Sequence, residues 1–254
     1  MRGMTPEKGE RHGRRVGLHR GWRRFERLRN GGRHRVLVLE AGGESGFWNR
    51  VPKGVAKLVT NPDKIWAYKV TQPRIPEGEA SEFWIRGKGV GGSSSVNGMI
   101  WSRGEDEDYD AWERDHGATG WNAAAMLGAF KRLEDHADGP TDRLGSGGRV
   151  HVEPEIFTYP LAEDMIAAGE SLQLSRVREL NARPGARVGY YSHNIRKGKR
   201  ESAAQTFLHP ARKRDNVTVA TGARAQRITF DGRRANGIEV AVDGELRHFA
   251  CAGE

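Results

Sequence analysis

The chain has 254 residues, of which 36% are hydrophobic, and its mean hydropathy is −0.73. This length suffices for one large domain or two small ones, and the sequence has no run of eighteen apolar residues, the length that a membrane span requires. The basic N-terminus lacks the apolar segment of a secretory signal. One cysteine, Cys251, rules out an internal disulfide and fits a reducing, cytoplasmic location, where we expect it to be an ordinary strand residue.

The net charge of +9 is confined to the N-terminus. Residues 1–35 hold twelve Lys and Arg side chains against three Glu, so the rest of the chain has equal numbers of basic and acidic side chains. Because the charges of residues 36–254 balance, this part of the chain has no net positive potential that would attract phosphates. We therefore expect no nucleic-acid partner. Residues 1–33 show no helix or strand pattern and are expected to be an atypical, disordered basic leader. An RNA-binding arm is the alternative.

The first expected element is residues 36–39, a short apolar run that is followed by Gly42 and Gly43. Such a run, bounded by glycines, predicts a strand buried on both faces, as in a parallel sheet. Residues 44–85 contain four prolines and are expected to form surface loops around short elements.

Residues 87–98 form a glycine–serine run that leads into an apolar segment. A flexible linker and a tight backbone turn are both consistent with glycine and serine. Val90 and Val96 interrupt the run, whereas a linker would stay polar, so we favour a buried loop in which glycines let the main chain approach something closely.

Helices are expected at residues 121–135, with Asn122 as N-cap, and at residues 161–174. From residue 217 the apolar spacing changes to alternation, and turns at residues 221–222, 231–232 and 243–244 separate the segments. The pattern predicts an antiparallel meander whose last strand is residues 246–251. The fold class is therefore α/β or mixed α+β.

No catalytic or metal-binding residue is assigned from the sequence alone. The acidic residues 105–108 lack calcium-loop spacing and predict a solvated helix start. The serines at 93–95 lack the Gly-x-Ser-x-Gly frame of a hydrolase. The nine histidines are interpreted as surface or satisfied side chains.

Two segments together carry a family resemblance. Residues 37–43 (LVLEAGG) followed by residues 86–99 (RGKGVGGSSSVNGM) resemble the glucose–methanol–choline (GMC) oxidoreductases. Residues 110–113, 117–122 and 200–208 are similar to the choline and alcohol dehydrogenase branch of that family. The resemblance covers residues 34–254 and implies a partial Rossmann-like FAD-binding domain, an N-terminal-half fragment without the C-terminal substrate domain.

The resemblance implies a role for nine residues in binding FAD. Glu40 would hold the adenosine ribose, as a carboxylate at the end of a strand does in dinucleotide-binding folds. An ordinary solvent-facing glutamate is the alternative. The glycines that would let the backbone pass close to the cofactor are Gly89, Gly91 and Gly92. The residues that would line the flavin are Asn97, Gly98, Met99 and Ile100. The backbone of Ala225 would meet the adenine.

The resemblance also implies the chemistry, which is oxidation of a small-molecule alcohol with hydride transfer to flavin N5. Some members attach FAD through a histidine directly before the asparagine. Here that position is Val96, so we expect non-covalent FAD. The catalytic base of the family lies in a region near its C-terminus that this chain does not match. Trp66 resembles a tryptophan near the substrate pocket, and core packing is the alternative. A non-catalytic fragment or interaction module is the alternative function.

The chain departs from the family before Val36, where no strand with Gly-x-Gly-x-x-Gly is found. In that family these glycines seat the pyrophosphate on a helix N-terminus. Codons for residues 17–27, read one nucleotide out of phase, permit such a motif. The basic leader is therefore hypothesised to be a frameshift product, and the encoding DNA would test this.

Overall fold

The computed structural model describes residues 35–70, 82–155 and 157–251, so the predicted basic leader lies outside the described residues. The mixed helix and strand content expected from the sequence is confirmed. The helices are α2 (Phe47–Arg50), α3 (Val55–Leu58), α4 (Asp106–His116), α5 (Ala123–Leu133), α6 (Pro160–Ser171) and α7 (His209–Arg212), with 3-10 turns η1 (Pro52–Gly54), η2 (Gly92–Ser95) and η3 (Leu180–Ala182) and a π-helical turn η4 (Ala204–Leu208). The strands are β1 (Val36–Leu39), β2 (Ile65–Val70), β3 (Glu82–Gly87), β4 (Glu134–His136), β5 (Val150–Val152), β6 (Ser175–Arg176), β7 (Arg187–Val188), β8 (Ile195–Arg196), β9 (Lys199–Arg200), β10 (Val217–Ala220), β11 (Ala223–Asp231), β12 (Arg234–Val242) and β13 (Glu245–Ala250).

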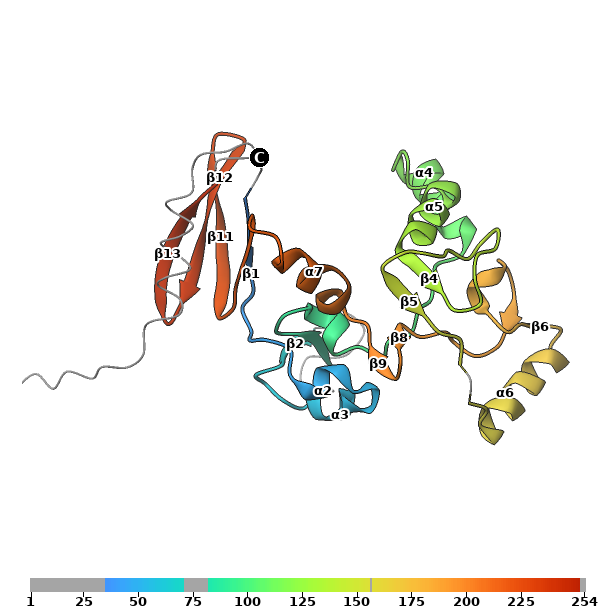
Figure 1. Cartoon of the computed structure of the whole chain (residues 1–254). Helices are drawn as coiled ribbons and strands as arrows, with labels where there is room; N and C mark the ends of the chain where they lie inside the picture. The colour runs from blue at the N-terminus through green and yellow to red at the C-terminus, as the bar shows by residue number, and fades with distance from the viewer. Residues whose placement is uncertain (1–34, 71–81, 156, 252–254) are drawn as a thin grey trace, which may run out of the picture.

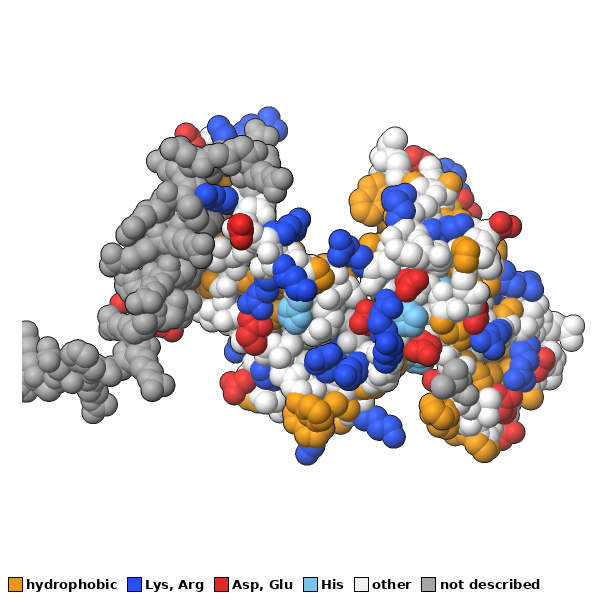
Figure 2. Space-filling model, in the orientation of Figure 1, with side chains coloured by type: hydrophobic (Ala, Val, Ile, Leu, Met, Phe, Trp, Pro, Cys, Tyr) orange, Lys and Arg blue, Asp and Glu red, His pale blue; other side chains and the backbone are white. Residues whose placement is uncertain are grey.

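The elements form three groups along the molecule (Figure 1). Strands β11, β12 and β13 stand at one end beside β1, and helices α4, α5 and α6 lie at the other end. The middle group holds α2, α3, β2 and α7, and it also contains the glycine–serine loop that follows β3. Figure 2 shows basic and acidic side chains interspersed over the described part of one face.

Strands β11, β12 and β13 form a three-stranded antiparallel sheet. The two-residue turn between β12 and β13 is Asp243-Gly244, and both residues have positive φ, of 51° and 81°. This is the geometry of a type I′ turn, which Asp-Gly favours because its twist matches that of the strands. The prediction that residues 217–219 open this meander is wrong, because β10 pairs parallel with β1, with Val36 opposite Val217.

A small core joins the parallel pair to this sheet. Val240 and Val242 of β12 are fully buried against Ala220 and Ala223, and Leu37 and Leu39 of β1 pack on the same cluster together with Ile238 and Phe249. The prediction that β1 is buried on both faces is wrong, since Val36 is exposed and the other three residues are only half-buried. Within the described residues β1 has one neighbouring strand, so one of its edges carries no ladder.

The described part of residues 44–85 is more regular than its prolines suggest. Strands β2 and β3 pair antiparallel along their full length, from Ile65 opposite Gly87 to Val70 opposite Glu82. The side chains of Tyr68, Phe83 and Trp84 are exposed on this hairpin. The sequence does not distinguish this hairpin from loops, because neither strand has a buried face that would make apolar and polar residues alternate.

The two helices that the sequence predicts at residues 121–135 and 161–174 are observed. Asn122 is the N-cap of α5, where its side-chain oxygen accepts a hydrogen bond of 3.0 Å from the amide of Ala125, as predicted. Helix α6 covers most of the predicted residues 161–174. The acidic residues at 106–108 form the first turn of α4, where their negative charge is favourable near the helix dipole. Among the described residues, no helix has the length and apolar character to cross a membrane.

Candidate cofactor-binding site

Glu40 stands directly after β1 and connects the strand to the glycine–serine loop. Its backbone is held on the β10 side, where its amide donates to Ala220 O at 2.9 Å and its carbonyl accepts from Ala223 N at 2.8 Å. One carboxylate oxygen, Oε1, accepts from the amides of Gly42 at 2.8 Å and Gly89 at 2.9 Å. The other oxygen, Oε2, makes no hydrogen bond to the described residues. The carboxylate therefore fastens the loop with one oxygen and keeps the second available.

The loop between β3 and Asn97 has the backbone that its glycines allow. Gly89, Gly91 and Gly92 have φ values of 142°, 95° and 54°, which are conformations that side chains with a Cβ rarely adopt. Val90 and Val96 are buried and anchor the loop, and the amide of Val90 donates to Gly43 O at 3.0 Å. The predicted buried loop, rather than a linker, is confirmed.

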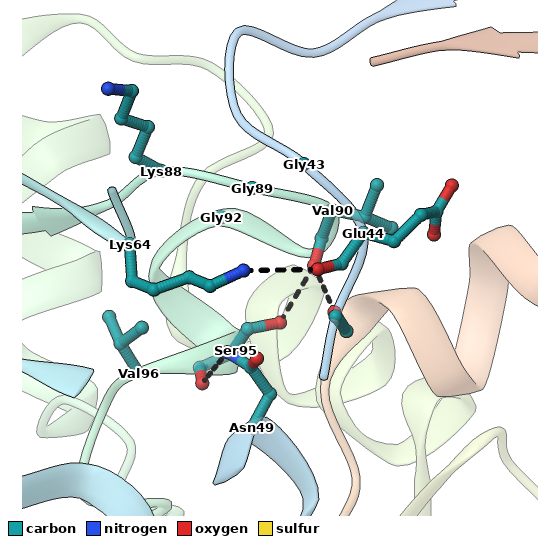
Figure 3. Close-up of a pocket in the computed structure, with 11 residues that line it drawn as sticks. Gly43, Glu44, Asn49, Lys64, Lys88, Gly89, Val90, Gly92, Ser95 and Val96 are labelled. Carbon is teal, nitrogen blue, oxygen red and sulfur yellow. Dashed lines mark hydrogen bonds between the residues drawn. The ribbon is translucent and has the colours of Figure 1, made fainter. Parts of the chain in front are cut away.

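Figure 3 shows the small pocket between this loop and the segment that follows Glu40. Ser45 and Ser95 both donate to the carbonyl of Val90, at 2.7 and 3.0 Å, and Asn49 donates to Ser95 O at 3.2 Å. The cavity that remains has a volume of about 10 Å³, which is room for about one water molecule. A ligand of the size of a dinucleotide does not fit in this space.

Residues 97–100 present an open backbone turn. The Oδ1 atom of Asn97 accepts from the amide of Met99 at 3.1 Å, and Met99 has a φ of 63°. Met99 is buried, whereas Asn97, Gly98 and Ile100 are exposed. A Cβ placed on Gly98 would have no heavy atom within 4 Å. The turn thus offers main-chain groups to a ligand on its exposed side.

Ala225 lies on β11 and is exposed, next to a bulge in the pairing with β12. The turn that precedes β11 contacts the segment after Glu40, since the amide of Gly222 donates to Gly42 O at 3.1 Å. Ala225 therefore follows a turn that is fixed beside the end of β1. The binding role of all nine predicted residues stays a prediction, although the geometry joins Glu40 directly to the loop.

Arg200 is a functional candidate for which the sequence analysis assigned no role. Its Nη1 atom donates to Asn97 Oδ1 at 2.6 Å and to Ser94 O at 3.2 Å. Three residues further on, the amide of Ala203 donates to Ser94 Oγ at 2.9 Å, and Ala204 lies against Gly91. The only sequence signal was the family-like segment at residues 200–208, which gave no indication of the contact with the loop.

A buried carboxylate, Glu134, holds the end of the loop. It is 0% exposed and accepts from Trp101 Nε1 at 2.7 Å, from Arg103 Nη2 at 2.7 Å and from the amide of Gly145 at 2.6 Å. Arg103 also donates to Arg143 O at 2.7 Å. Trp101 directly follows the exposed turn, so the network fixes where the turn ends.

A second buried carboxylate, Glu179, pairs with a histidine. Its Oε2 accepts from Ser192 Oγ and contacts His136 Nε2 at 3.1 Å, and its Oε1 accepts from the amide of Asn181 at 2.8 Å. Burial alone would raise the pKa of Glu179, but the hydrogen bonds from His136, Ser192 and Asn181 outweigh it and hold the pKa below its usual 4.5. Burial lowers the pKa of His136, and Glu179 more than restores it, to above 6.5.

These two shifts predict a stability window. Glu179 stabilises the fold above pH 4.5, and this contribution is lost as the pH falls through its lowered pKa. His136 stabilises below pH 6.5, and its contribution is lost as the pH rises through its raised pKa. The difference in urea midpoint between the wild-type chain and Glu179→Gln should therefore be largest between pH 4.5 and 6.5. A difference that is constant from pH 3 to 9 (about the range over which carboxylate and imidazole titrate) would contradict the pairing.

Within residues 35–70, 82–155 and 157–251, no group of three or more His, Cys, Asp and Glu side chains is arranged to hold a metal ion. The hydrogen-bonding groups of the site are backbone amides, one strand-end carboxylate and one buried guanidinium. Such a set is suited to the hydroxyl and carbonyl groups of a large organic ligand, which accept and donate hydrogen bonds at many points.

Comparison with known protein families decides the relationship. The model of the GMC oxidoreductase family matches residues 28–253. The chain belongs to the GMC oxidoreductase family. This family and its named members are FAD-dependent oxidoreductases. The recognition made from residues 37–43 and 86–99 is confirmed.

Several GMC relatives can be named. The oxygen-dependent choline dehydrogenase of Rhizobium johnstonii is 36% identical over 221 residues, which cover 87% of this chain and 40% of the relative. The enzyme of the same name from Staphylococcus aureus is 34% identical and has 39% of its length covered. The crystal structure of pyridoxine 4-oxidase from Mesorbium loti superimposes with a TM-score of 0.76 at 31% identity, over 85% of this chain and 43% of that one. The chain thus spans about two-fifths of the length of these relatives.

Three features of the residues around the loop fit bound FAD. The open side of Gly98 and the exposed turn around it leave space for a flat ring against main-chain groups. Two donors of the buried Arg200, Nε and Nη2, have no hydrogen-bond partner among the described residues. Glu40 keeps one carboxylate oxygen available at the strand end. These are the groups that a ligand with ribose hydroxyls and a polar ring would use.

Proposed function

We propose that this chain forms part of the FAD-binding site of a GMC oxidoreductase that oxidises a CH–OH group of an alcohol, in the manner of a choline-type dehydrogenase. The observation that carries the proposal is the fastening of the glycine loop to Glu40 at the end of β1, together with the exposed backbone turn at residues 97–100. Bound FAD would supply a two-electron acceptor for the hydride of the alcohol carbon.

Each predicted residue has a distinct task in this proposal. Glu40 Oε2 accepts from the ribose hydroxyls, and the backbone beside Ala225 meets the adenine. The glycines that let the loop pass close to the cofactor are Gly89, Gly91 and Gly92. The residues that face the flavin are Asn97, Gly98, Met99 and Ile100. The buried side chain of Val96 has no nucleophilic atom, which supports non-covalent FAD.

The residues of this chain bind and orient, and we assign none of them to proton transfer. The histidine with the clearest structural role, His136, is buried against Glu179. The single cysteine, Cys251, supports a reducing cytoplasmic compartment for this activity.

The experiment that tests the proposal is a titration of the purified chain with FAD, followed by flavin absorbance and protein fluorescence. Saturable binding at micromolar FAD, about −8 kcal/mol, is the expected result. Absence of saturation would show that the chain does not hold FAD and would overturn the proposal.

Gly98→Ala separates cofactor contact from folding. Because the added Cβ has no heavy atom within 4 Å in the protein, we expect the free energy of unfolding, measured with urea, to change by no more than a surface substitution changes it, about 0.5 kcal/mol. If the flavin ring lies against Gly98, the same methyl group must displace it, and the affinity for FAD should fall at least tenfold, or about 1.4 kcal/mol. An unchanged FAD affinity would remove Gly98 from the site.

A further inference from the structure

Arg200, at the end of β9, is almost completely enclosed. The residue is 1% exposed, and only one of its three guanidinium nitrogen atoms, Nη1, has hydrogen-bond partners among the described residues. These partners are Asn97 Oδ1 at 2.6 Å and Ser94 O at 3.2 Å. Both belong to the loop that faces the proposed flavin position. Nε and Nη2 are buried without a partner in the described part of the chain.

The charge of Arg200 is not balanced by a carboxylate. No ion pair joins it to an acidic side chain within the described residues, and the neighbouring Glu201 is directed to Arg196, at 3.4 Å. Burial lowers the pKa of Arg200 to about 10, so the guanidinium is still protonated at neutral pH. A buried charge that has only neutral acceptors is costly for folding, and such groups concentrate at functional sites.

Arg200 also determines the shape of the turn. Asn97 Oδ1 accepts from Arg200 and from the amide of Met99 at once, and Met99 holds a left-handed backbone with a φ of 63°. A non-glycine residue in this region costs about 1–3 kcal/mol and persists only where its surroundings enforce it. The charge-assisted hydrogen bond from Arg200 is the strongest contact that Asn97 makes, and it fixes the side chain that caps Met99.

We propose that Arg200 is a positioning residue that holds the turn at residues 97–99 through Asn97 and places an uncompensated positive charge behind the flavin that this turn faces. The inference rests on the proposed function and deepens it. Two-electron reduction adds negative charge to the flavin ring, and a nearby buried cation stabilises that charge more strongly than the neutral oxidised ring. Arg200 should therefore raise the affinity of the chain for reduced FAD relative to oxidised FAD.

The test compares Arg200→Met with Arg200→Lys and with the matched control Arg196→Met. Arg196 lies on the same β8–β9 hairpin, but its side chain is 40% exposed and pairs with Asp135 and Glu201. Binding of oxidised FAD is titrated, and the reduction potential of bound FAD is measured. Arg200→Met should lower the ratio of reduced to oxidised affinity at least tenfold, which is about 30 mV for a two-electron couple. Arg200→Lys, which keeps the charge, should restore most of it, and Arg196→Met should not change it.

Hydrogen exchange of the chain without FAD measures the positioning role independently. Arg200→Met and Asn97→Ala should both speed exchange in the peptide that covers residues 94–101, and Arg196→Met should not. If Arg200→Met does not fold, Arg200→Gln, which removes the charge and keeps a hydrogen-bond donor near Asn97, replaces it in both measurements. If Arg200 had only a structural role, Arg200→Met would weaken the binding of oxidised and reduced FAD equally. That outcome would overturn the electrostatic role.

Failure of the inference is distinguishable from failure of the proposed function. If the wild-type chain binds no FAD, the function is wrong, and the exchange of residues 94–101 alone decides whether Arg200 holds the turn. If FAD binds and both the affinity ratio and the exchange are unchanged in Arg200→Met, the inference is overturned while the function stands.

Discussion

Glu134→Gln is expected to destabilise the protein by about 3–5 kcal/mol, the cost of removing one charged partner of a buried ion pair. Glutamine has nearly the same volume, so the effect is electrostatic. The substitution removes the carboxylate that faces Arg103, whose side chain is 5% exposed, and it turns an amide group toward donors that need an acceptor. The urea midpoint measures the loss. Because the same carboxylate accepts from Trp101 at the end of the turn, FAD binding should weaken with it.

The matched control is Glu107→Gln on α4. Glu107 pairs with Arg114 at 2.9 Å, but the two side chains are 73% and 55% exposed. Exposed pairs of this kind contribute about 0–1 kcal/mol. Equal urea midpoints for the two variants would show that the Glu134 network does not stabilise the fold.

Gly87→Ala is expected to cost about 1–3 kcal/mol through overpacking and to abolish measurable FAD binding. A Cβ at Gly87 would stand 2.2 Å from Gly92 O and 2.7 Å from Ser93 N, and these are backbone atoms that cannot rotate aside. The end of β3 and the turn η2 would have to separate, which would also stretch the hydrogen bond from the Gly87 amide to Ser93 Oγ. Urea denaturation and the FAD titration check the two effects.

Gly43→Ala is the control for this close approach. Gly43 belongs to the same site, but a Cβ there would meet no heavy atom within 4 Å. We expect its stability to stay within about 0.5 kcal/mol of the wild type. If Gly87→Ala were as stable as Gly43→Ala and bound FAD as tightly, the contact between β3 and η2 would not constrain the loop.

The elements that the sequence predicted best are those set by local interactions. The capping oxygen of Asn122 and the acidic first turn of α4 act within one helical turn, so their residues reveal them. The buried loop was predictable in the same way, because Val90 and Val96 interrupt an otherwise polar run. The family was recognised from the motif that contains that loop, and the matched family model agrees.

The features that the sequence could not give depend on partners far along the chain. Alternation at residues 217–219 indicates a strand, but only the folded chain shows that its neighbour is β1 and not β11. Arg200 and Glu134 look like surface charges in sequence, since nothing nearby reveals their burial. Their partners, Asn97 and Trp101, come from distant positions. Whether the nine predicted residues bind FAD stays a prediction, because hydrogen bonds within the protein do not identify the ligand.

The division of the described strands into six separate sheets, none with more than three strands, has a consequence for cooperativity. In a protein with one continuous sheet, breaking any ladder exposes its neighbours, and the molecule unfolds as a unit. Here the β11–β13 sheet at one end of the molecule shares no ladder with the β4–β5 pair near the other end. Each can therefore open locally at its own free energy. Thermal unfolding should then occur in steps that differ between probes placed at the two ends of the molecule.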